Sequence, residues 1–352
     1  MKINKRKNAE VYCGIDFHKN TSTLCMLYPD GEEAEPITTI KTSLLVRFLA
    51  NRKHWKIGIE ATGGVNHLVE QLKVQHEEVV IINSNKFRGI GIGGKKTDER
   101  DARALAEALR LSFVPEVHHR SKYSRQIKSL LTTREHIVQA RVDSMNHVRG
   151  TLREYGITMP AGAENFYEQA RAKIDLVDCV GIRDSLVLVL ENVVRYLAQE
   201  KAVEDKVKEL TKNDERVARL QTIPGVGIIT TLMMISVIDD IGRFPNAKEF
   251  ASYLGLIPSV HASANMRMMG AITRSGSEML RRYLVHGARA WMRYSPKNDK
   301  NRIWAEKVKE RRGMNKATVA LAHRMARICF ALLRDGSQYR MPTAGTIQKA
   351  AA

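Results

Sequence analysis

The apolar and polar positions in the N-terminal third of the chain change repeatedly between a strand-like and a helix-like period. Short β-branched runs bounded by polar turns indicate strands, and apolar residues at three and four spacing indicate helices. The predicted strands are 11–17, 21–28, 36–40, 56–60 and 78–82, and the predicted helices are 43–51, 65–74 and 97–111, the last with Thr97 as N-cap. This order predicts an α/β domain.

Beyond this domain the period becomes that of long helices. Apolar residues recur at every seventh position over 124–155, and a second helical stretch covers 184–210, with a Pro- and Gly-containing tip at 159–162. Arg134 and Arg141 occupy seam positions, where they either snorkel or meet a partner. The pattern predicts a helical coiled-coil hairpin, although a packed bundle with no partner has the same period.

From Val217 onward the pattern is again helical, but turns interrupt it. Residues 223–227 separate two apolar helical stretches, and a polar, Met- and Arg-containing loop follows 255–258. Helices are expected over 278–292 and 316–333. The chain is therefore expected to comprise an α/β domain at 1–115, a helical hairpin at 116–215, a mostly helical domain at 216–335 and a flexible tail at 336–352.

The basic charge of the chain indicates the kind of partner that it binds. Lys and Arg number 57 against 38 Asp and Glu, which gives a formal net charge of +19. Such an excess indicates a polyanion such as nucleic acid. Ribosomal and membrane-surface proteins share this balance, but no strongly hydrophobic amphipathic anchor is visible.

The sequence also bears on compartment. No run of about 18 apolar residues occurs, and the first ten residues lack the apolar stretch of a signal peptide. The four cysteines are scattered without the spacing of a zinc ribbon or a disulfide framework. We expect a cytoplasmic protein with no membrane partner.

Acidic residues end two predicted strands and begin a predicted helix. Asp16 closes the first strand, Glu60 closes the fourth and precedes two glycines, and Asp98 and Asp101 share one helix face. Clustered carboxylates raise one another's pKa, whereas Mg²⁺ prefers such oxygen ligands and bridges to phosphates. Two such ions can serve phosphoryl transfer. The four acids therefore predict a Mg²⁺ site, with Mn²⁺ as the alternative, although each acid alone also suits a turn or a cap.

The order of these elements carries a resemblance. With acids on the first strand, the fourth strand and the last helix, the domain resembles the ribonuclease-H-like fold in its RuvC variety. The motifs GIDFHK (14–19), EATG (60–63) and KTDERDA (96–102) resemble those of the DEDD transposases of the insertion-sequence 110 and 1111 group, which are related to Piv-type DNA invertases. The resemblance implies that Asp16, Glu60, Asp98 and Asp101 are the catalytic metal ligands.

The C-terminal motifs extend this resemblance to residues 12–333. They are similar to the second transposase domain of the same group, in which a serine after a Gly-Leu-x-Pro motif is the nucleophile, and the matching residue is Ser263. The group usually has glycine next, whereas this chain has Ala264, which resists the positive φ that glycine adopts. The motifs are IPGVG (223–227), RFP (243–245), YLGLIP (253–258), GAITRSG (270–276) and LRRYL (280–284).

Nucleic-acid contacts are expected around this serine. A serine hydroxyl needs a base, a metal or cationic surroundings to act as a nucleophile. Arginines that can neutralise phosphate charge are Arg267, Arg274, Arg281 and Arg282, and His261 lies near them in sequence. Gly225 and Gly227 resemble a helix-hairpin-helix turn, which either contacts a DNA phosphate or is purely structural.

The resemblance implies a DNA recombinase that cuts DNA through a phosphoserine linkage assisted by metal. It also implies a non-coding guide RNA, a homodimer or homotetramer as the active form, and a prokaryotic protein that associates with the nucleoid when active. The alternatives are a metal-only nuclease of the Holliday-junction type, a non-catalytic nucleic-acid-binding regulator on the same scaffold, and an RNA-processing enzyme.

Overall fold

The computed structural model describes residues 10–52, 54–76, 78–83, 97–162, 164–263 and 266–341. The chain forms two compact units, Met1–His119 and Arg120–Ala352. Within the described ranges, no helix is long and apolar enough to cross a membrane.

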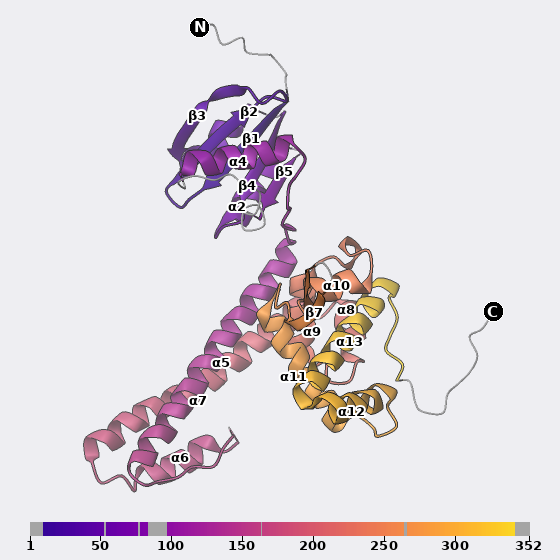
Figure 1. The fold of residues 1–352 in the computed structure, drawn as a ribbon. Coiled ribbons are helices and arrows are strands. Elements are labelled where there is room, and N and C mark those ends of the chain that lie inside the picture. The colour runs from indigo at the N-terminus through magenta and orange to yellow at the C-terminus, as the bar shows by residue number, and fades with distance from the viewer. Residues whose placement is uncertain are drawn as a thin grey trace, which may run out of the picture. The chain divides into compact units, whose positions relative to one another are not determined.

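The first unit contains a mixed five-stranded sheet (Figure 1). Its strand order is β3-β2-β1-β4-β5, in which β1 pairs antiparallel with β2 and parallel with β4. The carboxyl ends of β1 and β4 therefore lie side by side at one edge of the sheet. The strands are β1 Val11–Phe17, β2 Thr21–Leu27, β3 Glu33–Lys41, β4 Trp55–Glu60 and β5 Val79–Ile82, so all five predicted strands are confirmed.

Helices cover both faces of this sheet. Alternate strand residues such as Cys13 and Ile15 pack against the helices α1 and α2, which are Leu45–Leu49 and Val65–Lys73, and a 3₁₀ turn at Thr42–Leu44 precedes α1. On the opposite face, the helix α4, Asp98–Arg110, packs against the intervening strand residues. The residues of β1 that face α4 therefore include Tyr12 and, by the two-residue repeat, Asp16.

The second unit begins with a long antiparallel helical pair, α5 Lys122–Glu154 and α7 Val180–Thr211. Both predicted helices are confirmed, and the two seam arginines meet acidic partners: Arg134 pairs with Glu204 and Glu200, and Arg141 with Glu200.

The connection between α5 and α7 differs from the prediction of a simple tip. It contains a further helix, α6 Phe166–Ile174, whose Phe166 packs with Met145 of α5 and Leu186 of α7 in one apolar cluster. This helix is short, and its stability comes from packing rather than from a long periodic pattern of its own.

The helical pair shares its core with the rest of this unit. Ile127 and Leu131 of α5 join the apolar cluster around α9, in which residues 230–238 are all buried. Ser121, which caps α5, donates through its backbone N to Asp239 Oδ2 at 2.9 Å. The helices are α8 Glu215–Gln221, α9 Ile228–Ile238, α10 Ala247–Tyr253, α11 Glu278–Tyr294, α12 Lys300–Arg312 and α13 Met314–Asp335, with a 3₁₀ turn at Ile241–Arg243.

Two features of this region correct the sequence interpretation. The expected polar loop after residue 258 is a two-stranded hairpin, β6 Pro258–Ser263 paired antiparallel with β7 Met266–Ile272. The helix α12 was not predicted, because its sequence is dominated by charged residues and has no regular apolar stripe.

Candidate active site

Asp16 lies near the end of β1 with only 2% of its surface exposed. Burial raises the pKa of its carboxyl above the usual range, and the charges of Glu60, Asp98 and Asp101 raise it further, whereas His18 opposes the shift. Parallel pairing of Ile15 with Ile59 places Glu60 next to Asp16 along the sheet. Of the four acids, Asp16 and Asp98 belong to the group of close ligand atoms found among the described residues, and Glu60 and Asp101 do not.

Two of these acids lie at the start of α4. Thr97 caps the helix by accepting a hydrogen bond from the Arg100 backbone N at 3.3 Å, which confirms the predicted cap. Asp98 and Asp101 then fall in the first turn, where the helix dipole favours negative charge. Asp98 is 60% exposed, so this side of the cluster is open to solvent.

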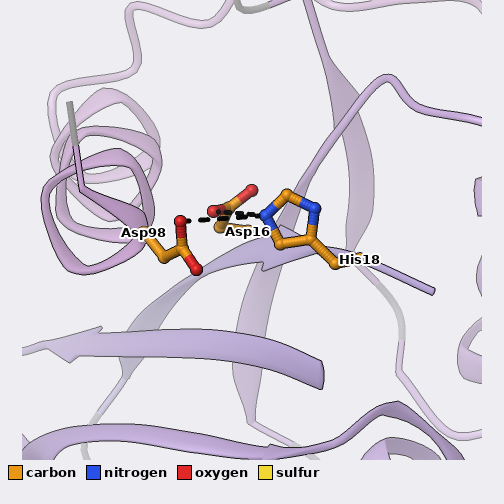
Figure 2. A group of neighbouring side chains, drawn as sticks. All are labelled: Asp16, His18 and Asp98. Atoms are coloured by element: carbon orange, nitrogen blue, oxygen red, sulfur yellow. Dashed lines mark hydrogen bonds and ion pairs between the residues drawn. The ribbon is translucent and has the colours of Figure 1, made fainter. Parts of the chain in front are cut away.

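His18 is a member of the cluster that sequence reasoning left unassigned. Its Nε2 lies 3.2 Å from Asp16 Oδ2 and 3.9 Å from Asp98 Oδ1 (Figure 2). The signal that could have found it is the two-residue spacing from Asp16, which places both side chains on the same side of an extended chain. His67, another histidine of the first unit, is exposed on α2.

The donor set fits a divalent cation. One ligand atom from each of Asp16, His18 and Asp98 can be chosen so that all three lie within 4.8 Å of one another. Carboxylate oxygens suit Mg²⁺ and Mn²⁺, and an imidazole nitrogen is an additional ligand for the latter. A cation here would also relieve the repulsion that raises the pKa of Asp16.

Ser263 is the last residue of β6 and pairs in register with Met266. The side chains of Ser263, His261 and Arg267, together with the whole of Ala264, lie outside the described residues. The structure thus places the backbone of the predicted nucleophile at the turn end of a hairpin.

The three other arginines occupy different environments. Arg274 is exposed, and its backbone has a φ of 57°, which is unusual for a residue with a Cβ. Arg281 is 9% exposed and donates to the carbonyl oxygens of Leu254 and Ser275. Arg282 is half exposed and pairs with Glu135 of α5.

The two glycines of the predicted helix-hairpin-helix turn also differ. Gly225 has a φ of 78°, and a Cβ placed on it would overlap the carbonyl oxygen of Gly287 in α11. Close packing against α11 therefore requires glycine at position 225. Gly227 is the N-cap of α9 and has no atom near the position of a Cβ, so this end of the turn is open.

Comparisons with known proteins agree with this arrangement. Residues 13–157 match a transposase model of the DEDD type from the IS110 group, and residues 217–302 match the model of the transposase IS116/IS110/IS902 family. The chain is 33% identical to the transposase for insertion sequence element IS1111A of Coxiella burnetii, over 93% of this chain and 90% of the relative. The chain belongs to the IS110/IS1111 family of transposases.

Other relatives support this assignment. The transposase for insertion sequence element IS1328 of Yersinia enterocolitica is 25% identical over 84% of this chain and 88% of the relative. The pilin gene-inverting protein of Moraxella lacunata is 25% identical over 78% of this chain and 80% of its own. The predicted resemblance is confirmed, and this IS110/IS1111 transposase is a DNA transposase or recombinase enzyme.

Proposed function

We propose that this transposase cuts and rejoins DNA with two functional centres, the four acids of the first unit and Ser263 of the second. The observation that carries the proposal is the close group of ligand atoms from the buried Asp16, from Asp98 and from His18. Glu60 directly follows Ile59, which pairs with Ile15 of β1. The strand order, with these acids on the first strand, the fourth strand and the last helix, supports a RuvC-like, ribonuclease-H-like domain.

The four acids would hold Mg²⁺, with Mn²⁺ as the alternative. When bound, the metal supplies Lewis-acid polarisation of a DNA phosphate. The carboxylates would hold the cation, whose positive charge would offset their mutual repulsion.

Ser263 is the proposed nucleophile. Its hydroxyl gives up its proton and forms a bond to the phosphorus of a DNA phosphodiester, while the bond from phosphorus to one sugar oxygen breaks and that oxygen takes up a proton. The resulting phosphoserine ester retains the energy of the original linkage, so the reverse attack by a sugar hydroxyl of another strand reseals DNA without ATP. Arg267 and Arg274 are the proposed phosphate contacts.

Partners follow from the family resemblance and from charge. Strand exchange between two duplexes requires two or more copies of the chain, so we propose a homodimer or homotetramer. The net charge of +19 suits backbone contacts to DNA and to a non-coding guide RNA. In this proposal the enzyme works on the DNA of a prokaryotic cytoplasm and nucleoid.

The first test of this function is a recombination assay with Ser263→Ala. We expect loss of at least about 10³-fold in recombinant product and loss of the covalent protein–DNA adduct. Ser259→Ala, on the same strand, is the matched control and is expected to retain both. A Ser263→Ala enzyme that still recombines without any adduct would show a metal-only nuclease mechanism, and an adduct that maps elsewhere would show a different nucleophile.

The second test removes a single negative charge from the cluster. Asp101→Asn keeps the shape of the side chain, and we expect strand cleavage to fall by about 10²-fold or more because a metal ligand is weakened. Glu99→Gln, two residues before Asp101 in the first turn of α4, is the control. Undiminished cleavage by Asp101→Asn would exclude the proposed set of four metal ligands.

A further inference from the structure

The imidazole of His18 lies close to two of the proposed metal ligands. Figure 2 shows its Nε2 directed toward both Asp16 and Asp98. Two ligand atoms that each lie about 2.1 Å from one octahedral ion are about 3.0 Å apart when adjacent and about 4.2 Å apart when opposite. The observed separations of 3.2 Å and 3.9 Å fall within that range.

The backbone holds His18 in this place. Its N donates to Thr21 O at 3.2 Å, and its carbonyl oxygen accepts from Thr42 Oγ1 at 2.8 Å. Thr42 is fixed in turn by a 2.9 Å hydrogen bond with Ser22 Oγ and by its N, which donates to Asn20 O at 3.0 Å. The turn that presents the imidazole is therefore tied to β2 and to the residue that follows β3.

We propose that His18 supplies a nitrogen ligand to the divalent cation held by Asp16 and Asp98. This inference rests on the metal site of the proposed function and adds to it a ligand outside the four acids. A mixed nitrogen and oxygen set favours Mn²⁺ over Mg²⁺ more than an all-carboxylate set does, because imidazole is a better ligand for the later divalent metals. The site is accordingly tuned toward Mn²⁺.

A nitrogen ligand has a direct spectroscopic signature. The test is electron spin-echo envelope modulation of Mn²⁺ added to the full-length protein, which reports ¹⁴N nuclei bound to the ion. We expect a ¹⁴N modulation that changes to the ¹⁵N pattern when the protein is grown with ¹⁵N-histidine. It should vanish in His18→Gln and persist in His67→Gln, an exposed histidine of the same unit.

Affinity gives a second measurement. Titrations of the same proteins with Mn²⁺ should show that His18→Gln lowers the Mn²⁺ affinity by about tenfold or more. His67→Gln should leave the affinity unchanged. The loss for Mg²⁺ should be smaller. Circular dichroism melting of both variants establishes that each is folded before these values are compared.

The outcomes separate this inference from the proposed function. Mn²⁺ that binds with oxygen ligands only, or a ¹⁴N signal that survives in His18→Gln, overturns the role of His18 while leaving the four-acid site intact. Mn²⁺ binding that is unchanged in Asp16→Asn overturns the metal site itself and the inference with it.

Discussion

Gly14 of β1 lies directly against the backbone of Ala102 in α4, so closely that a Cβ on Gly14 would overlap the carbonyl oxygen of Ala102 and the amide nitrogen of Ala106. This contact sets the distance between helix and sheet two residues before Asp16. The carboxylates at the start of α4 can approach Asp16 only because the helix lies this near.

Gly14→Ala is therefore expected to displace α4. Backbone atoms cannot yield as a flexible side chain does, so we expect a loss of about 1–3 kcal/mol in the free energy of unfolding of the first unit. Mn²⁺ affinity should fall as well, because Asp98 and Asp101 move with the helix. Urea unfolding and metal titration measure the two effects.

Gly63→Ala is the control for this substitution. Gly63 lies in the same unit and has no atom within 4 Å of the position of a Cβ. Its replacement should change neither measurement. Equal stability and equal metal affinity for Gly14→Ala would show that α4 does not depend on this contact.

The acids and the strands that carry them could be predicted from the sequence because both depend on local patterns. The run 11–17 is apolar and bounded by polar residues, and strand order places the end of β4 next to that of β1. The two-residue spacing from Asp16 indicates only which side of the chain His18 faces, and the position of its turn could not be predicted in this way. It depends on the hydrogen bond from Thr42 to the His18 carbonyl, a contact between residues 24 positions apart.

The hairpin β6–β7 shows a second limit of pattern reading. Met266–Ile272 has little of the β-branched alternation that signals a strand, and it contains Gly270. Pairing with β6 and anchoring of its base through Arg281 stabilise it instead. These are tertiary contacts, which composition does not reveal.

The environments of Arg281 and Arg274 predict different effects on DNA binding. Arg281→Met should loosen the base of the hairpin, because the carbonyls of Leu254 and Ser275 lose their donor. Amide hydrogen exchange over 258–272 should then become faster, with little change in the salt dependence of DNA affinity.

Arg274→Met should leave amide hydrogen exchange over 258–272 nearly unchanged and should alter the salt dependence of DNA affinity. Its side chain is exposed, and loss of one phosphate contact lowers the slope of log affinity against log salt by about 0.9. Fluorescence anisotropy at several salt concentrations measures that slope. An unchanged slope would place Arg274 away from DNA, and a lowered slope for Arg281→Met would contradict its assignment to the hairpin base.

The ionic cluster in the α5–α7 seam should stabilise the helical pair. Glu200 is 13% exposed and is shared by Arg134 and Arg141, which are 15% and 14% exposed. Glu200→Ala leaves both guanidinium groups short of a partner, at a cost of about 2–3 kcal/mol. We expect faster amide hydrogen exchange in α7.

Asp205→Ala serves as the control for Glu200→Ala. Asp205 is 60% exposed on the same helix, and its 3.7 Å ion pair with Lys208 is screened by solvent. Exchange in α7 should therefore be nearly unchanged in this variant. If the two variants behave alike, the seam does not depend on its buried charges.

His76 predicts a pH dependence for the first unit. It is 2% exposed, and burial lowers the pKa of its imidazole, with the backbone of Leu49 opposing the shift. The unfolded chain binds a proton near the ordinary value of about 6.5, whereas the folded chain resists protonation until a lower pH. The contribution of His76 to the free energy of unfolding is therefore at its full value above about pH 6.5 and falls as the pH drops below that value.

Urea unfolding followed by ¹⁹F NMR of 5-fluorotryptophan tests this, because the partly buried Trp55 packs against the core of the first unit and is its only tryptophan. His76→Leu should flatten the dependence of the unfolding free energy on pH between about 7.5 and 5, since no buried imidazole then resists protonation. His54→Gln removes an exposed histidine of the same unit and should leave the slope as it is. The same slope in His76→Leu as in the unaltered protein would assign the pH dependence to other groups.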